Sequence, residues 1–264
     1  MKFMARNRDI LIWELRKIGR FPLPEIIVLL LGLQIGLRMF DFNNSVSSGA
    51  FPTKETLDLL IRGQYQFHMS NVYSVTLSET FITLALASSL LVTISMALEL
   101  ENGTLRTYLS KPVGRGTLYI SKFISVFLVT CILPMITLVV SMYVLDPSMY
   151  AIFLKMWKTW ALLLIIMLIT TFFVTAVGFF MATLTRSVAL TPLLTLGMLF
   201  STDLLSSRIV YLPGGSMSRI VKYVLSNIEL TEGQAIISFI FMPLIGVILI
   251  LIAYLFFTRR IDLN

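Results

Sequence analysis

The chain has 264 residues, of which 57% are hydrophobic and only 13% are charged, and its mean hydropathy is +0.88. An ordinary globular domain carries roughly 25% charged residues, so no water-soluble fold would hide this much apolar surface. The formal charge of +7 does not indicate nucleic-acid binding, because in a membrane protein the Lys and Arg residues first report which side of the bilayer a loop occupies. Composition therefore predicts an all-α polytopic membrane protein, with residues 1–264 forming one membrane domain.

Six apolar blocks have the length that a bilayer core of about 30 Å requires. They lie at about 24–40, 76–98, 123–145, 159–184, 188–206 and 235–257. Helices are expected for all six, because isolated strands would leave backbone groups unpaired in lipid. The third, fourth and sixth blocks contain no charged residue in their interiors, as the high insertion cost of a central charge predicts.

The N-terminal segment, residues 1–22, has the pattern of a helix that lies at the cytoplasmic membrane interface. Apolar residues such as Ile10, Trp13 and Ile18 alternate there with charged residues such as Glu14 and Lys17. Tryptophan and basic side chains both favour the headgroup boundary. The alternative interpretation is an ordinary basic flank of the first span.

Basic residues predict the orientation of the chain in the membrane. If the N-terminus is cytoplasmic, thirteen of the 21 basic residues lie on the inner side: Lys2, Arg6, Arg8, Arg16, Lys17, Arg20, Arg106, Lys111, Arg115, Lys122, Arg186, Arg259 and Arg260. The positive-inside rule then predicts a multi-pass plasma-membrane protein with both termini in the cytoplasm. The long connections 41–75 and 207–234 become external, and apolar spacing within 216–230 predicts a short helix on the outer face.

The cytoplasmic segment 99–122 between the second and third spans has the composition of a docking element. Asn102 and Gly103 favour a turn, and Pro112 discourages continuation of the short helix that precedes it. Within that helix Leu105, Tyr108 and Leu109 share one face, surrounded by charged residues, as in many protein interfaces. The alternative is a helix folded back on the bilayer surface.

The same segment resembles a known family. The residues that carry the resemblance are an acidic pair, a Gly-Thr-Leu sequence, a Pro-Val pair and basic residues: Glu99, Glu101, Gly103, Thr104, Leu105, Leu109, Pro112, Val113, Arg115 and Lys122. In this pattern the chain is similar to permeases of the type-2 ABC transporter class, and the number and order of its spans are similar as well. Leu100, Arg106 and Gly114 depart from the usual pattern and leave the choice of partner open.

This resemblance implies a coupling helix that contacts a separate cytoplasmic ABC ATPase. The residues expected at that contact are Glu99, Glu101, Gly103, Thr104, Leu105, Tyr108, Leu109, Pro112 and Arg115. It further implies two ATPase copies, which would hold ATP and Mg²⁺, and a second copy of the permease or a homologous one. The chain itself would bind no cofactor and would be the membrane-spanning half of an exporter.

Catalysis within this chain is not expected. The sequence contains no G-x-x-x-x-G-K-[ST] phosphate loop, so ATP hydrolysis would take place on the partner subunit. His68, in the external connection 41–75, is the only histidine, which excludes an H-E-x-x-H zinc site and a multi-histidine metal site within one chain.

Three charged residues near the outer ends of spans, Arg38, Glu79 and Asp203, are expected to form an ion pair or a gate, or else to extend towards the interface separately. The resemblance also implies that the first and fifth spans take part in a conduit between two permeases, and the residues available there are mostly apolar: Gln34, Met39, Thr195, Met198 and Phe200. Such a lining favours an amphipathic or lipid-like substrate. The alternatives are a permease-like subunit for assembly or signalling, and an ion-driven secondary carrier, although no acidic residue lies at mid-span.

Overall fold

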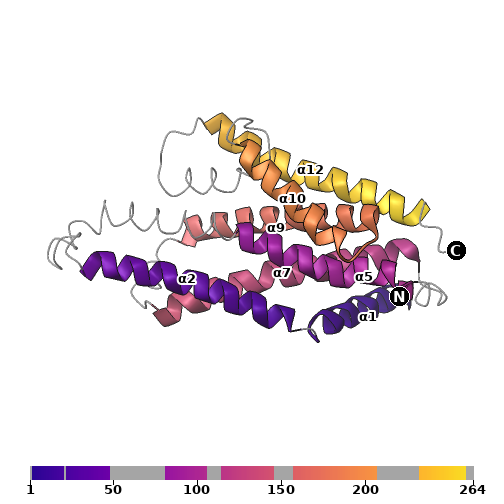
Figure 1. Cartoon of the computed structure of the whole chain (residues 1–264), viewed down its shortest axis with the longest axis horizontal. Helices are drawn as coiled ribbons and strands as arrows, with labels where there is room; N and C mark the ends of the chain where they lie inside the picture. The colour runs from indigo at the N-terminus through magenta and orange to yellow at the C-terminus, as the bar shows by residue number, and fades with distance from the viewer. Residues whose placement is uncertain are drawn as a thin grey trace.

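The computed structural model describes residues 2–20, 22–47, 81–105, 114–145, 157–206 and 232–259, and all regular structure in these ranges is helical (Figure 1). The elements are α1 (Lys2–Ile18), α2 (Leu23–Ser47), the π-helical turn η1 (Thr93–Ala97), α5 (Leu98–Glu101), α7 (Arg115–Leu145), α9 (Trp157–Thr185), α10 (Leu190–Ser206) and α12 (Glu232–Arg259). The predicted all-α polytopic fold is confirmed. A further helical stretch, residues 81–92, continues directly into η1 and α5.

Four helical stretches in the described part of the chain are long and apolar enough to cross a membrane: Phe81–Glu101, Arg115–Thr137, Leu164–Thr185 and Ile240–Arg259. Two shorter apolar stretches, Leu23–Gln34 and Leu190–Thr202, lie in α2 and α10. All six fall within or overlap the six predicted blocks. The third block was predicted to begin at residue 123, whereas α7 begins at Arg115, so Lys122 lies inside the helix and not in a loop.

Helix α9 lies at the centre of the bundle and packs against α7, α10 and α12, while α7 also packs against α1 and α2 (Figure 1). Aromatic rings fill the contact between α7, α9 and α12. The ring of Tyr119 lies 5.6 Å from that of Phe179 and 5.3 Å from that of Phe257, and Phe123 lies 5.4 Å from Phe179. Edge-on and tilted pairs at these distances add to the stabilisation from burial.

A glycine allows α9 to approach the helix Phe81–Glu101 closely. A Cβ atom at Gly178 would lie only 3.0 Å from Cγ2 of Val92, which is fully buried. Ser88 and Thr175, on the same two helices, are hydrogen-bonded at 3.4 Å. Small and hydroxyl-bearing residues at helix contacts are typical of membrane bundles, where close packing replaces the hydrophobic effect between helices.

The outer surface of the bundle is apolar. Leu29 on α2, Leu193 on α10 and Leu244 on α12 are 65%, 67% and 52% exposed. A water-soluble protein would bury side chains of this kind, whereas lipid accepts them. The surface therefore agrees with the membrane location that composition predicted.

The start of α1, α5, the start of α7 and the end of α12 lie at the same end of the molecule (Figure 1). This arrangement agrees with the expectation that the termini and the segment 99–122 share one side of the membrane. That this side is cytoplasmic stays a prediction. The external connections 41–75 and 207–234, the short helix within 216–230 and His68 lie largely or wholly outside the described residues, although α2 continues through Ser47.

Candidate functional site: a buried charge cluster at one end of the bundle

The helix Phe81–Glu101 ends in a glycine turn. The N–H of Asn102 donates to the carbonyl of Leu98 at 3.0 Å, and Gly103 then adopts a φ of +68°, in the left-handed region that favours glycine. The Thr104 hydroxyl lies 3.5 Å from the Glu99 carbonyl and caps the same turn. The docking segment thus begins with a helix C-terminus at Glu101, and helical backbone resumes at Thr104 and Leu105, directly after the turn that the sequence predicted at Asn102 and Gly103.

Lys122 is the centre of a buried charge cluster directly inside this turn. Its ammonium group is fully buried and lies 2.7 Å from Oε1 of Glu14, 2.9 Å from Oε2 of Glu99 and 3.0 Å from the Ser95 carbonyl. Glu14 is fully buried and Glu99 is 3% exposed. The ammonium therefore donates hydrogen bonds to Glu14 and to the Ser95 carbonyl, and it forms a further ion pair with Glu99.

Lys17 completes the cluster at its more exposed edge. Its ammonium group pairs with Oε1 of Glu99 and lies 5.7 Å from the centre of the Trp13 ring, within the range of a cation–π contact. The pKa of Lys17 is lowered from its ordinary value of 10.5 to about 8, chiefly by burial and also by repulsion from Lys122, while attraction to Glu14 opposes the change. Two carboxylates and two ammonium groups balance in charge, as a buried site requires.

The local backbone brings the Ser95 carbonyl into this cluster. Residues Thr93–Ala97 form a single π-helical turn, in which the N–H of Leu98 donates to the carbonyl of Thr93, five residues back. A π turn inserted in an α-helix displaces the following residues and is frequent at functional sites. Here it lies one turn before Glu99, and Thr93, Ser95, Met96 and Ala97 are all buried.

The cluster joins three elements that are distant in sequence. Glu14 and Lys17 come from α1, Glu99 from α5 and Lys122 from α7. Glu99 and Lys122 stand at the two ends of the predicted docking segment 99–122. Any displacement of that segment is therefore coupled through direct ion pairs to α1 and to the spans that contain Glu99 and Lys122.

The structure corrects two residues of the predicted ATPase contact. Glu99 is buried within the charge cluster, and Leu105 is fully buried in the hydrophobic core with residues such as Met96 and Tyr119. Leu105 is therefore not part of an exposed face, and Glu99 is held by ion pairs to Lys17 of α1 and Lys122 of α7. Both hold the segment in place.

The remaining residues of that contact are placed differently. Glu101, Thr104 and Arg115 are exposed and Gly103 is half-buried. The Glu101 carboxylate accepts a hydrogen bond from the N–H of Val188, which ties the segment to the turn between α9 and α10. Tyr108, Leu109 and Pro112 lie outside the described residues, so their role stays a prediction.

The predicted outer ion pair is not tested. Arg38 and Asp203 lie in α2 and α10, but their side chains are outside the described part, as is the whole of Glu79. Of the expected conduit lining, Gln34 accepts a hydrogen bond from the Thr83 hydroxyl at 2.8 Å. Thr195 is fully buried, and its hydroxyl has no hydrogen-bond partner in the described part of the chain.

Sequence reasoning missed the cluster as a unit, although a signal for Glu14 was present. Glu14 stands four residues after Ile10 and four before Ile18, so it occupies the apolar face of α1, where a charge needs a buried partner. Lys122 was assigned to a loop because the third span was placed too late in the sequence. The described residues bring no three metal-binding side chains together.

In the part of the chain that the structure describes, four long and two shorter apolar helices, an apolar outer surface and ion-paired charges at one end define a multi-span α-helical membrane protein. Residues 12–261 match the family model of the ABC-2 family transporter protein, and the chain belongs to this family. It is a permease of the type-2 ABC transporter class, a kind of membrane subunit that generally works with an ATPase subunit and is not itself an enzyme. No curated protein matches the chain.

Proposed function

We propose that this chain is the permease of an ATP-driven exporter and that the segment 99–115 receives the movement of a cytoplasmic ATPase. Two ATPase copies, which hold ATP and Mg²⁺, act on two permeases, either identical or homologous. The end of the molecule that carries the start of α1 and the end of α12 is then cytoplasmic, in the plasma membrane.

The buried charge cluster is the observation that carries this proposal. Lys122 contacts Glu14 and Glu99 while Lys17 contacts Glu99, so the two ends of the docking segment and α1 form one unit. A partner that displaces the segment acts on α1, α5 and α7 at once. An ATPase can shift the permease between two conformations only by as much as the ATPase–permease contacts differ in free energy between them. A rigid connection through the charge cluster transmits that difference to the spans.

The exposed residues next to the cluster form the proposed contact. Glu101, Thr104 and Arg115 are exposed, and Tyr108, Leu109 and Pro112 complete the contact in this proposal. Glu99 and Leu105 support the surface from beneath. This division of roles predicts that substitutions of Tyr108 weaken partner binding, whereas substitutions of Glu99 weaken the permease itself.

The substrate that this proposal favours is amphipathic or lipid-like. Gln34, Met39, Thr195, Met198 and Phe200 combine apolar surface with a few polar groups, of which Thr195 offers a buried hydroxyl without a partner in the described residues. A bare ion would need charged or carbonyl ligands along its path.

The test is co-purification from native membranes, followed by an ATPase assay and transport into inverted vesicles. An ATP-binding subunit should accompany the wild type. Tyr108→Ala should lose it or uncouple hydrolysis from transport, while Tyr143→Ala, at the other end of α7, should keep both. A chain that purifies without an ATPase and transports with an ion gradient would contradict the proposal and indicate a secondary carrier. ATPase recovery without transport would indicate an assembly or signalling subunit.

A further inference from the structure

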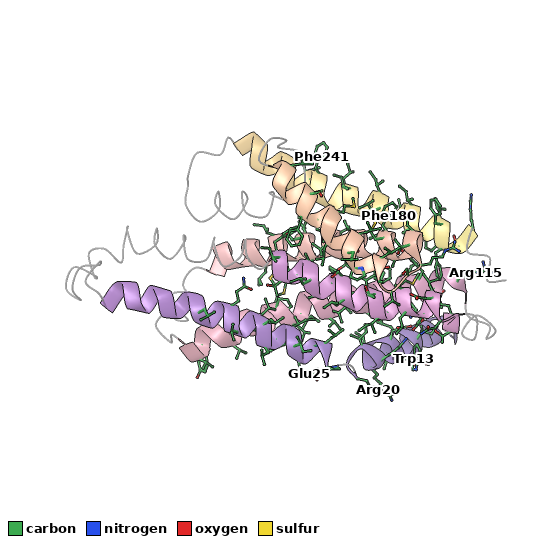
Figure 2. All side chains as sticks on the ribbon, viewed as in Figure 1. Trp13, Arg20, Glu25, Arg115, Phe180 and Phe241 are labelled. Carbon is green, nitrogen blue, oxygen red and sulfur yellow. The ribbon has the colours of Figure 1, made fainter. Side chains whose placement is uncertain are left out.

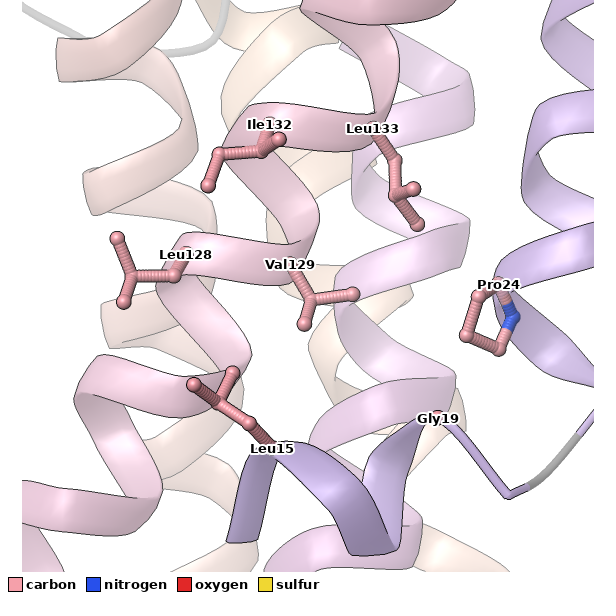
Figure 3. A pocket seen from close by; sticks show the side chains of 7 residues that line it. All are labelled: Leu15, Gly19, Pro24, Leu128, Val129, Ile132 and Leu133. Carbon is pink, nitrogen blue, oxygen red and sulfur yellow. The ribbon is translucent and has the colours of Figure 1, made fainter. Parts of the chain in front are cut away.

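An apolar pocket lies at the junction of α1 and α2, on the face of α7 that these helices leave uncovered. It has a volume of about 250 Å³ and is lined by Leu15, Gly19, Pro24, Leu128, Val129, Ile132 and Leu133 (Figure 3). Helix α1 ends at Ile18 and α2 begins at Leu23, so no helical side chains cover α7 between them. Gly19 lines the pocket at the end of α1 and has no side chain to fill it.

The pocket opens towards the bilayer and not into the bundle. Ile132 lines it and is 46% exposed, within the apolar stretch Arg115–Thr137 of α7. Leu128, Val129 and Leu133 extend into the same space from successive turns of α7 (Figure 3). In a membrane, a surface of this kind is filled by hydrocarbon, because an apolar cavity has no polar groups to hold water.

Positive charge stands beside the mouth of this pocket. Arg16 occupies the last turn of α1, and the exposed Arg20 follows the pocket residue Gly19 directly. Lys17 is paired with Glu99, and the exposed Glu25 follows the pocket residue Pro24, so two arginines stand near the pocket against one glutamate. Figure 2 shows Arg20 on the same side of the molecule as Trp13, which is 41% exposed and of a residue type that favours the headgroup region. An apolar slot next to guanidinium groups is complementary to a molecule with an acyl chain and a phosphate.

We propose that this pocket binds one anionic phospholipid of the bilayer, with part of an acyl chain against Val129 and Leu133 and the phosphate beside Arg20. Guanidinium groups bind phosphate through paired, charge-assisted hydrogen bonds. Leu15 lines the pocket and follows Glu14 of the charge cluster, so the bound lipid supports α1 where it contacts Lys122. This site is separate from the proposed ATPase contact and does not depend on it.

The test measures lipid retention by native mass spectrometry of the detergent-purified full chain, titrated with dioleoyl phosphatidylglycerol or dioleoyl phosphatidylcholine. We expect the wild type to bind the anionic lipid at least about threefold more tightly. Arg20→Gln should remove this preference, whereas Arg259→Gln, which changes an exposed arginine at the end of α12, should keep it. Equal binding of the two lipids by the wild type would overturn the proposal.

A matched pair of substitutions tests the pocket itself. Val129→Phe fills the pocket and should reduce binding of both lipids about tenfold, while Val140→Phe, at a site on α7 that is 53% exposed, should leave binding unchanged. Equal effects of the two substitutions would contradict the pocket.

Inorganic phosphate should not compete with the lipid at equal concentration; competition would assign the binding to a free phosphate site. Arg20→Gln changes an exposed side chain, so its result stands even if Val129→Phe fails to fold.

Discussion

Lys122 and Glu14 are 108 positions apart in the sequence, and their side chains form an ion pair of 2.7 Å in which both are fully buried. The pair connects α1 to α7 inside a protein whose other buried contacts are mostly apolar. Buried pairs do not stabilise a fold merely by their attraction, because two charges lose their hydration. Removal of either residue alone is nevertheless destabilising, because the other charge is then left buried without a partner.

The first prediction concerns the loss of the Lys122 charge. Lys122→Met should destabilise the protein by about 3 to 5 kcal/mol, because two carboxylates then lie buried without their shared partner. Thermal unfolding in detergent, followed by tryptophan fluorescence, measures the change. Adding Glu14→Gln to Lys122→Met should recover part of the loss. If Lys122→Met unfolds like Arg259→Gln, which changes an exposed residue, the pair is not a structural element.

The second prediction compares two glutamates of the same short helix. Glu99 contacts two lysines and is 3% exposed, whereas Glu101 is exposed and accepts one backbone hydrogen bond. Glu99→Gln should therefore destabilise the fold by about 2 to 4 kcal/mol and Glu101→Gln by less than about 1 kcal/mol. Denaturation in detergent checks the difference. Similar losses in the two variants would show that Glu99 is not buried in the protein in solution.

The sequence was sufficient for the fold class and the approximate spans. Apolar length alone decides which segments cross a bilayer, and all six apolar helices fall within or overlap the predicted blocks. It was not sufficient for the boundary at α7. Hydropathy places a lysine outside the membrane segment unless its partners are known, and Glu14 and Glu99 lie more than twenty residues away from Lys122 in the sequence.

The candidate site shows the same limit. Helical spacing predicts that Leu105 shares a face with Tyr108 and Leu109, but spacing alone cannot distinguish a face that meets a partner from one that meets the same chain. Leu105 is fully buried in the hydrophobic core of its own chain. The π-helical turn at Thr93–Ala97 has no signature in residue type, since it depends on packing and not on local preference.

The third prediction concerns the dependence of stability on pH. The folded protein lowers the pKa of Lys17 from 10.5 to about 8, chiefly by burial, so the unfolded chain binds more protons between these values. Stability from this group should therefore rise with pH from about 8, by about 1.5 kcal/mol at pH 9.5. Lys17→Arg should lack this rise, because arginine stays charged throughout. The difference between the two unfolding curves measures the effect, and parallel curves would contradict it.

The last prediction concerns the close contact of α9 with the helix that carries the π turn. A Cβ atom at Gly178 would lie 3.0 Å from Cγ2 of Val92, whereas one at Gly197 of α10 would meet no atom within 4 Å. Gly178→Ala should therefore destabilise the protein by about 1 to 3 kcal/mol through overpacking, against the gain in helix propensity that alanine brings. Gly197→Ala receives only that gain, about 1 kcal/mol.

Thermal unfolding of the two alanine variants gives opposite shifts if the contact is as close as the structure has it. Val92→Ala combined with Gly178→Ala should restore most of the stability, because the methyl group that the new Cβ meets is removed. Such recovery is specific to neighbours, since substitutions at distant sites add independently. Stabilisation by Gly178→Ala equal to that by Gly197→Ala would mean that α9 does not lie against Val92, and the position of the π turn beside the charge cluster would then need to be revised.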